Sequence, residues 1–428
     1  MTTKLQTIRP DAIPALTGLR FIAALLVLIS HAMPKIVPVP DPTTNGYVFF
    51  HSFAGIGMPL FFVLSGFVIQ YNYASQIRDQ GLPGVYNFLV TRFARLYPLF
   101  FVCVAFDLTI KWSYQQLPAQ TMSALPYYLT LTHSWFYTLL DGHSLVFLFG
   151  WMPQVSWSIS TEWFFYLAFP FICLGLLQLK SLQSKIILLI LVALAGAALV
   201  ITVGTHTIQL NTIAVAHFGE AANYIGPTKS ESLLNWFLGY SPYPRIFEFM
   251  LGCVIADIHL SMSRNAPSSF EQNLGMYALL FALAATLCVH SITYLPLFQH
   301  VNWFPLLKLM QHSMGYGIPL AAVIFCCARY SNVITRTLSA KYMVLCGEVS
   351  YSIYMLHMLI IGAFRWEAAT ATSWQIGIAN SLRMIVVIAA TIGLSLITYT
   401  LIEMPAKKWL TRRLTYRPKT VATAPVHS

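Results

Sequence analysis

Ten apolar segments, each long enough to cross a lipid bilayer, constrain this chain more than any other feature. Inside lipid a segment must satisfy its own backbone hydrogen bonds, so such segments form α-helices. The composition agrees, with 57% hydrophobic and 9% charged residues and a mean hydropathy of +0.66, whereas soluble domains carry about 25% charged residues. The sequence therefore predicts an all-α polytopic membrane protein with spans near residues 16–36, 52–74, 86–110, 156–178, 185–204, 241–260, 272–291, 311–332, 343–364 and 378–402.

The basic residues predict the orientation. With the N-terminus in the cytoplasm, 18 of the 25 Lys and Arg residues fall on the inner side, as the positive-inside rule requires. An even number of spans places the C-terminus there too. We therefore expect a cytoplasmic segment at 1–15, a transmembrane domain at 16–410 and a disordered cytoplasmic tail at 411–428. The location predicted is the plasma membrane, which in a bacterium is the inner membrane. The net charge of +11 is scattered between apolar spans, so no nucleic-acid partner is expected.

The first apolar segment holds two ionisable residues, Arg20 and His31. It is longer than a signal-peptide core and no Ala-x-Ala site follows it, so we expect it to be retained. Eleven residues of helix rise about 16 Å, which separates the two side chains by roughly half a bilayer. Ionisable groups at membrane depth are costly and mark functional sites.

Two further segments carry ionisable side chains with more than one interpretation. Arg92 and Arg95 are three residues apart on one helix face. They could anchor the span at the interface, or bind phosphate oxygens as a pair of guanidinium groups. Glu162 could form a structural hydrogen bond to another helix, or orient an imidazole, with His31 as the natural partner.

A polar stripe follows one face of the ninth span, where Ser350, Tyr354 and His357 are spaced by four and three residues. Hydrogen bonding between helices is one interpretation, especially for the first two, and substrate binding is the other. Arg245 and Glu248 are also three residues apart, which predicts an ion pair within one helix.

Two outer loops, about 111–155 and 205–240, are long, and the first is rich in aromatic residues. These side chains could form an interfacial belt or a stacking platform for a sugar-like acceptor. The chain contains no Gly-x-Ser-x-Gly, Walker or dinucleotide motif. No cluster of residues has metal-ligand spacing, and the seven cysteines all lie in apolar runs. We therefore expect neither a metal nor a bound cofactor.

Together, these motifs make the sequence resemble the membrane-bound acyltransferase 3 family, whose members O-acylate surface polysaccharides and related acceptors. The matching elements run in family order over nearly the whole chain. They are Leu-Thr-Gly-Leu-Arg-Phe-Ile-Ala-Ala (16–24) with His31, Gly-Met-Pro-Leu-Phe-Phe-Val-Leu-Ser-Gly-Phe-Val-Ile (57–69), Arg-Phe-Ala-Arg-Leu-Tyr-Pro (92–98), Trp-Ser-Ile-Ser-Thr-Glu-Trp-Phe-Phe-Tyr (157–166), Arg-Ile-Phe-Glu-Phe-Met-Leu-Gly (245–252), Gly-Glu-Val-Ser-Tyr-Ser-Ile-Tyr-Met-Leu-His (347–357) and Glu-Met-Pro (403–405).

The resemblance implies ten spans, a cytoplasmic acyl-CoA donor and a carbohydrate or glycolipid acceptor on the opposite side. Acetyl-CoA is the donor expected by default, as a co-substrate rather than a bound cofactor. The resemblance maps functional roles onto Arg20, His31, Arg92, Arg95 and Glu162. Some family members carry an additional extracytoplasmic hydrolase-like domain, and we expect none within this chain.

The resulting hypothesis is acyl transfer from a thioester to a hydroxyl, which needs a base and stabilisation of the developing oxyanion. We predict His31 as the base and Glu162 as the group that orients it. Arg20, Arg92 and Arg95 would bind the donor. The polar stripe Ser350, Tyr354 and His357 is the further candidate for substrate binding. A covalent acyl-histidine intermediate is an open variant. The competing classes are a secondary transporter or flippase of a small anionic or glycolipid solute, and a non-catalytic scaffold.

Overall fold

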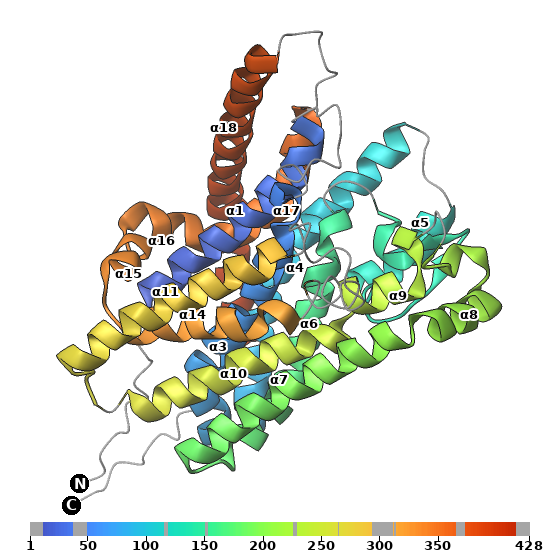
Figure 1. Ribbon diagram of the computed structural model, residues 1–428. Helices are drawn as coiled ribbons and strands as arrows, with labels where there is room; N and C mark the ends of the chain where they lie inside the picture. The colour runs from blue at the N-terminus through green and yellow to red at the C-terminus, as the bar shows by residue number, and fades with distance from the viewer. Residues whose placement is uncertain are drawn as a thin grey trace, which may run out of the picture.

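A computed structural model describes residues 12–36, 49–114, 119–149, 153–225, 229–263, 265–292, 311, 314–364 and 373–416. In this part of the chain, nearly all regular structure is helical, and Figure 1 shows the long helices packed into one bundle. The all-α polytopic fold class predicted from the sequence is confirmed at this level.

The helices that coincide with the predicted spans follow one another in the predicted order. They are α1 (Pro14–Ile36), α3 (Ala54–Gln80), α4 (Leu82–Ser113), α6 (Trp157–Leu177), α7 (Leu182–Thr205), α10 (Pro242–Met262), α11 (Ser269–Ser291), α14 (Gly317–Arg329), α16 (Lys341–Glu348), α17 (Ser350–Ala363) and α18 (Ser373–Thr398). Shorter elements connect them: α5 (Ala119–Leu129), β1 (Leu139–Leu140), β2 (His143–Ser144), η1 (Leu145–Phe147), η2 (Pro153–Ser156), α8 (Thr207–Phe218), η3 (Glu220–Ala222), η4 (Lys229–Glu231), α9 (Leu233–Asn235), η5 (Trp236–Tyr240), η7 (Met314–Tyr316), α15 (Val333–Leu338), η8 (Tyr399–Glu403) and α19 (Met404–Leu414).

Seven of the described helices are long and apolar enough to cross a membrane. All ten predicted segments coincide with helical structure, but three of them depart from a simple span. The ninth is broken between α16 and α17, whose axes differ by 70°. The eighth holds only a short apolar helix, and the sixth carries three charged side chains. The number of complete crossings therefore stays a prediction.

Helix α10 is largely buried despite its charges, and it packs most extensively against α3. The two backbones approach closely at Gly66 and Gly252. A Cβ atom at Gly66 would overlap the carbonyl oxygen of Phe249, and one at Gly252 would overlap that of Val63. Small residues at such crossings let membrane helices gain van der Waals contact. These glycines therefore set the distance between α3 and α10.

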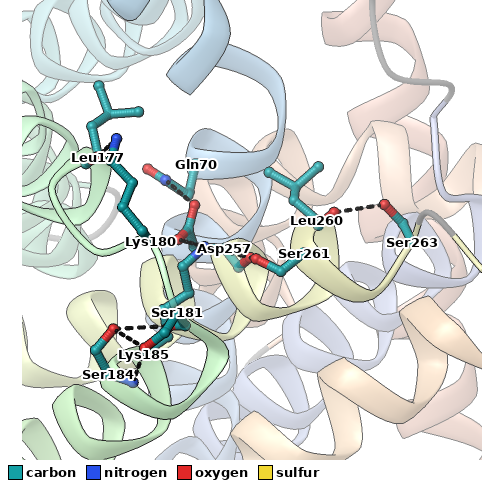
Figure 2. Close-up of polar contacts among 10 residues, drawn as sticks. All are labelled: Gln70, Leu177, Lys180, Ser181, Ser184, Lys185, Asp257, Leu260, Ser261 and Ser263. Atoms are coloured by element: carbon teal, nitrogen blue, oxygen red, sulfur yellow. Dashed lines mark hydrogen bonds and ion pairs between the residues drawn. The ribbon is translucent and has the colours of Figure 1, made fainter.

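A buried ion pair ties α7 to α10 at one end of these helices. The Nζ atom of Lys185 lies 2.7 Å from Oδ2 of Asp257 and donates to Oγ of Ser261 at 2.7 Å. From α3, Nε2 of Gln70 donates to Oδ1 of Asp257 at 3.3 Å. Figure 2 shows these side chains converging from three helices. This pairing explains how α10 can carry charge inside the bundle.

The predicted outer loops contain structure of their own. In the first, a two-residue turn with positive φ at Asp141 (50°) and Gly142 (80°) joins β1 to β2, and an Asp-Gly pair favours this hairpin geometry. Nearby, the fully buried ring of His133 stacks on Tyr128, with ring centroids 4.0 Å apart. The second loop, expected over 205–240, contains the helix α8.

The C-terminal region continues further as helix than predicted. A π-helical turn, η8, joins α18 to α19, and α19 ends at Leu414. The expectation of disorder from 411 is therefore wrong for 411–414, and 417–428 lie outside the described residues. In η8 the buried carboxylate of Glu403 accepts a hydrogen bond of 2.9 Å from Ser352 on α17.

Candidate active site

Two adjoining cavities run through the bundle beside α1. The smaller has a volume of about 50 Å³ and the larger about 240 Å³. Met58 on α3 and Tyr354 on α17 line both, so the cavities meet at these two side chains. A third cavity of about 100 Å³, near the start of α1, shares Arg20 and Val68 with the smaller one. By this measure each has room for several water molecules.

The smaller cavity gathers most of the side chains that the sequence singled out. Six of the eight predicted site residues line it: Arg20, Arg92, Arg95, Glu162, Ser350 and Tyr354. They come from α1, α4, α6 and α17, four helices far apart in the sequence. Arg92 and Arg95 reach the same cavity because they share one face of α4.

Arg92 is buried at the wall of the smaller cavity, with 7% of its surface exposed. One terminal nitrogen donates to the hydroxyl of Tyr73, and the guanidinium lies 4.5 Å from the centroid of that ring. Its Nε atom has no hydrogen-bond partner among the described residues. A buried guanidinium with an unused donor is suited to an anionic ligand such as a phosphate.

The larger cavity contains His31 from the opposite end of α1. Besides Tyr354, its wall carries three aromatic side chains, Trp157, Tyr224 and Tyr240, and the amide of Asn235. Two cations also line it. The Nζ atom of Lys229 lies 4.7 Å from the ring centroid of Tyr224. Arg245 forms the predicted pair with Glu248, at 3.2 Å, which confirms that expectation.

Within the described part of the chain, His31 contacts a second histidine. Its Nδ1 atom lies 2.8 Å from Nε2 of His357 on α17, and the two rings are nearly parallel, with an interplanar angle of 5°. The Nδ1 atom of His357 lies 2.5 Å from the backbone carbonyl oxygen of Tyr354. His357 is fully buried, and it lines neither of the two cavities.

Glu162 has a different partner from the one predicted. Its Oε1 atom accepts a hydrogen bond of 2.8 Å from Ser65 on α3, and its charge attracts that of Arg92. Among the described residues no hydrogen bond joins Glu162 to His31, so the hypothesis that Glu162 orients His31 is wrong. The physical reason is location, since Glu162 faces the smaller cavity and His31 the larger.

Within the predicted polar stripe, Tyr354 and Ser350 differ in their contacts. The hydroxyl of Tyr354 accepts from Ser158 at 2.8 Å and donates to the carbonyl of Val155 at 2.7 Å. Hydrogen bonding between helices is therefore confirmed for Tyr354. The buried Oγ atom of Ser350 has no hydrogen-bond partner among the described residues, and the side chain lines the smaller cavity.

Several residues that line the cavities or contact the predicted site residues escaped sequence reasoning. Ser65 and Tyr73 of α3 contact the predicted site residues, yet neither is ionisable at neutral pH, so the search for buried charges missed them. The aromatic wall of the larger cavity comes from Trp157 and the 205–240 region. Of the first loop's aromatic residues, none among the described ones lines either cavity.

A family model described as an acyltransferase domain matches residues 13–400 of this chain. The chain belongs to the acyltransferase 3 family. Both cavities and all eight predicted site residues lie within the matched region. The resemblance inferred from the motifs is thereby confirmed.

The relatives of this acyltransferase 3 protein include two that are named as acyltransferases. Acyltransferase MdmB of Streptomyces mycarofaciens is 28% identical, over 96% of this chain and 95% of its own length. O-acetyltransferase OatA of Staphylococcus aureus is 23% identical over 96% of this chain, but the match spans only 60% of OatA. Nodulation protein 10 of Rhizobium leguminosarum is 24% identical over 91% of this chain and 92% of its own length. No solved structure matches the chain significantly.

Proposed function

We propose that this integral-membrane acyltransferase moves an acyl group, in the first place acetyl, from cytoplasmic acyl-CoA to a hydroxyl of an extracytoplasmic carbohydrate-type acceptor. One observation carries the proposal. The cavity lined by three arginines adjoins the cavity that contains His31, and the two meet at Met58 and Tyr354.

The smaller cavity, which is lined by three arginines, is the proposed donor site. Arg20, Arg92 and Arg95 supply positive charge for the phosphates of coenzyme A. The third cavity, at the predicted cytoplasmic start of α1, extends this site toward the compartment that contains acyl-CoA. The thioester then lies toward Tyr354, where the two cavities meet. Ser350 offers a hydroxyl to the donor, because its Oγ atom is not used by the described protein.

The larger cavity is the proposed acceptor site. The aromatic side chains of Trp157, Tyr224 and Tyr240 can stack on the apolar faces of sugar rings, and the amide of Asn235 can hydrogen-bond to sugar hydroxyls. The name of one relative, an O-acetyltransferase, supports both the acetyl group and transfer to oxygen.

His31 is the proposed general base. It removes the proton from the acceptor hydroxyl as the oxygen attacks the thioester carbonyl, and a C–O bond forms. The tetrahedral intermediate then expels the thiolate as the C–S bond breaks, and the thiolate takes the proton back from His31. The neighbouring arginines are the groups available to stabilise the oxyanion.

Labelled acetyl-CoA added to inside-out membrane vesicles from the native host tests the proposal. Vesicles that contain the full chain should release free coenzyme A and retain label on the endogenous acceptor. His31→Ala should lower this rate by about 10²- to 10⁴-fold, which is the usual contribution of a general base. His290→Ala is the matched control, because His290 is a buried histidine that lines neither cavity.

Each competing class predicts a different result. A transporter would move solute without releasing coenzyme A, and a scaffold would tolerate His31→Ala. Wild-type transfer by His31→Ala would refute the proposed base. Label trapped covalently on His31 would replace direct transfer by the acyl-histidine variant. Mass analysis of surface glycans from cells with and without the protein would identify the acceptor.

A further inference from the structure

The contact between His31 and His357 continues into a second hydrogen bond, which determines the direction of both. The Nδ1 atom of His357 lies 2.5 Å from the carbonyl oxygen of Tyr354. A carbonyl oxygen can only accept a hydrogen bond, so the hydrogen of this ring is on Nδ1. His357 is fully buried, and burial favours the neutral ring, which has one hydrogen.

The remaining nitrogen of His357 must then act as an acceptor. Its Nε2 atom lies 2.8 Å from Nδ1 of His31, so Nδ1 of His31 is the donor in that contact. A neutral imidazole that has its hydrogen on Nδ1 has a lone pair on Nε2. The order of hydrogen bonds therefore selects one tautomer of His31, the one whose Nε2 atom is basic.

We propose that His357 is the positioning residue of this enzyme, which holds His31 in the tautomer and ring orientation that a general base needs. This inference rests on the proposed function, in which His31 removes the proton of the acceptor hydroxyl. That proton goes to Nε2 of His31 while Nδ1 keeps its own hydrogen and its bond to His357. The imidazolium of His31 so formed donates a hydrogen bond from Nδ1 to the neutral ring of His357. It then returns the Nε2 proton to the leaving thiolate.

The carbonyl group that ends this series of hydrogen bonds belongs to a residue held in place by two helices. Tyr354 provides the carbonyl on α17, and its hydroxyl is bonded to Ser158 and to the carbonyl of Val155. The same turn of α17 therefore lines the junction of the two cavities and orients His357. This arrangement couples the position of the base to the place where donor and acceptor meet.

The decisive experiment compares His357→Gln with His357→Asn in the same vesicles, at saturating labelled acetyl-CoA. A glutamine carbonyl can reach the position of Nε2 and accept from His31, whereas an asparagine carbonyl reaches only the position of Nδ1. Both replacements are neutral, polar amides. We expect His357→Gln to keep most of the rate. We expect His357→Asn to lose at least about 10-fold, a loss that stays below the 10²- to 10⁴-fold contribution of the general base itself.

Two further measurements distinguish positioning from a purely structural role. The KM for acetyl-CoA should stay unchanged in His357→Asn while kcat falls, because the donor site is intact. His290→Gln and His290→Asn are the matched controls, since His290 is a buried histidine whose bonds are to Tyr316 and the carbonyl of Phe49. Both should transfer at the wild-type rate.

Equal loss in His357→Gln and His357→Asn, or full activity in His357→Asn, would overturn the inference. A rise in KM in place of a fall in kcat would also overturn it, because it would indicate substrate binding. The failure of the proposed function gives a different result, namely a wild-type rate in His31→Ala. An inactive His31→Ala together with a fully active His357→Asn would refute the positioning role alone.

Discussion

Removing one partner of the buried pair between Lys185 and Asp257 should destabilise the protein, whereas removing both should not. Asp257→Leu leaves the ammonium of Lys185 in a site where only 10% of that side chain is exposed. Lys185→Met leaves the carboxylate of Asp257 with the amide of Gln70 but without its counter-charge. The double variant places two apolar side chains in a mostly buried site (Figure 2).

The magnitude follows from the distance and the burial. Two unit charges 2.7 Å apart attract by about 6 kcal/mol at an effective dielectric constant of roughly 20. Desolvation of two nearly buried groups offsets most of that attraction. Leaving one charge without its partner costs about 3 kcal/mol, while apolar replacement of both partners is close to neutral. For a chain of this length, 3 kcal/mol corresponds to an apparent Tm lower by roughly 3–6 °C.

Thermal unfolding in one detergent compares four purified proteins: the wild type, Asp257→Leu, Lys185→Met and the double variant. Together they form a double-mutant cycle. Each single variant should melt below the wild type, and the double variant should recover most of the loss. The coupling should also persist at high salt, because a buried pair is poorly screened. A double variant as unstable as the sum of the two single variants would refute the reasoning, since the pair would then contribute by packing alone.

Three further predictions concern separate parts of the molecule. Burial lowers the pKa of His133 to about 3. The folded ring therefore stays neutral at pH 5, while the unfolded ring gains a proton below its usual pKa of about 6.5. The free energy of unfolding, unaffected above pH 6.5, should be lower by about 2 kcal/mol at pH 5. Melting at pH 7.5 and 5 should show a flatter pH dependence for His133→Asn, and an equal dependence would contradict the burial argument. Gly252→Val should lower the apparent Tm, with a cost of about 1–3 kcal/mol, because its side chain would overlap the carbonyl of Val63; unchanged melting would mean that α3 and α10 can separate freely. Arg92→Gln should raise the KM for acetyl-CoA by about 10- to 100-fold through loss of charge-assisted hydrogen bonds. Arg92→Lys should raise this KM less, because it keeps the charge. An unchanged KM would indicate that the phosphates bind elsewhere.

Much of the fold could be predicted from local sequence. The apolar segments became helices because a lipid environment leaves the backbone no other way to satisfy its hydrogen bonds. The pair of Arg245 and Glu248 was predictable because its geometry is internal to one helix. The break between α16 and α17 was not predicted, because the two helices together are apolar enough for one span although they meet at a bend of 70°.

The sequence alone also identified which ionisable residues are worth testing, because charge within an apolar segment is costly wherever that segment lies. It determined that the chain is helical and membrane-spanning, and it indicated the family through its motifs. The sequence could not predict which side chains on different helices would pair. Glu162 and His31 were paired by their apparent depth in two spans, yet they face different cavities. Only the tertiary structure brought His357 to His31, and Asp257 to Lys185, because residues 326 and 72 positions apart meet through packing rather than through any periodicity of the chain.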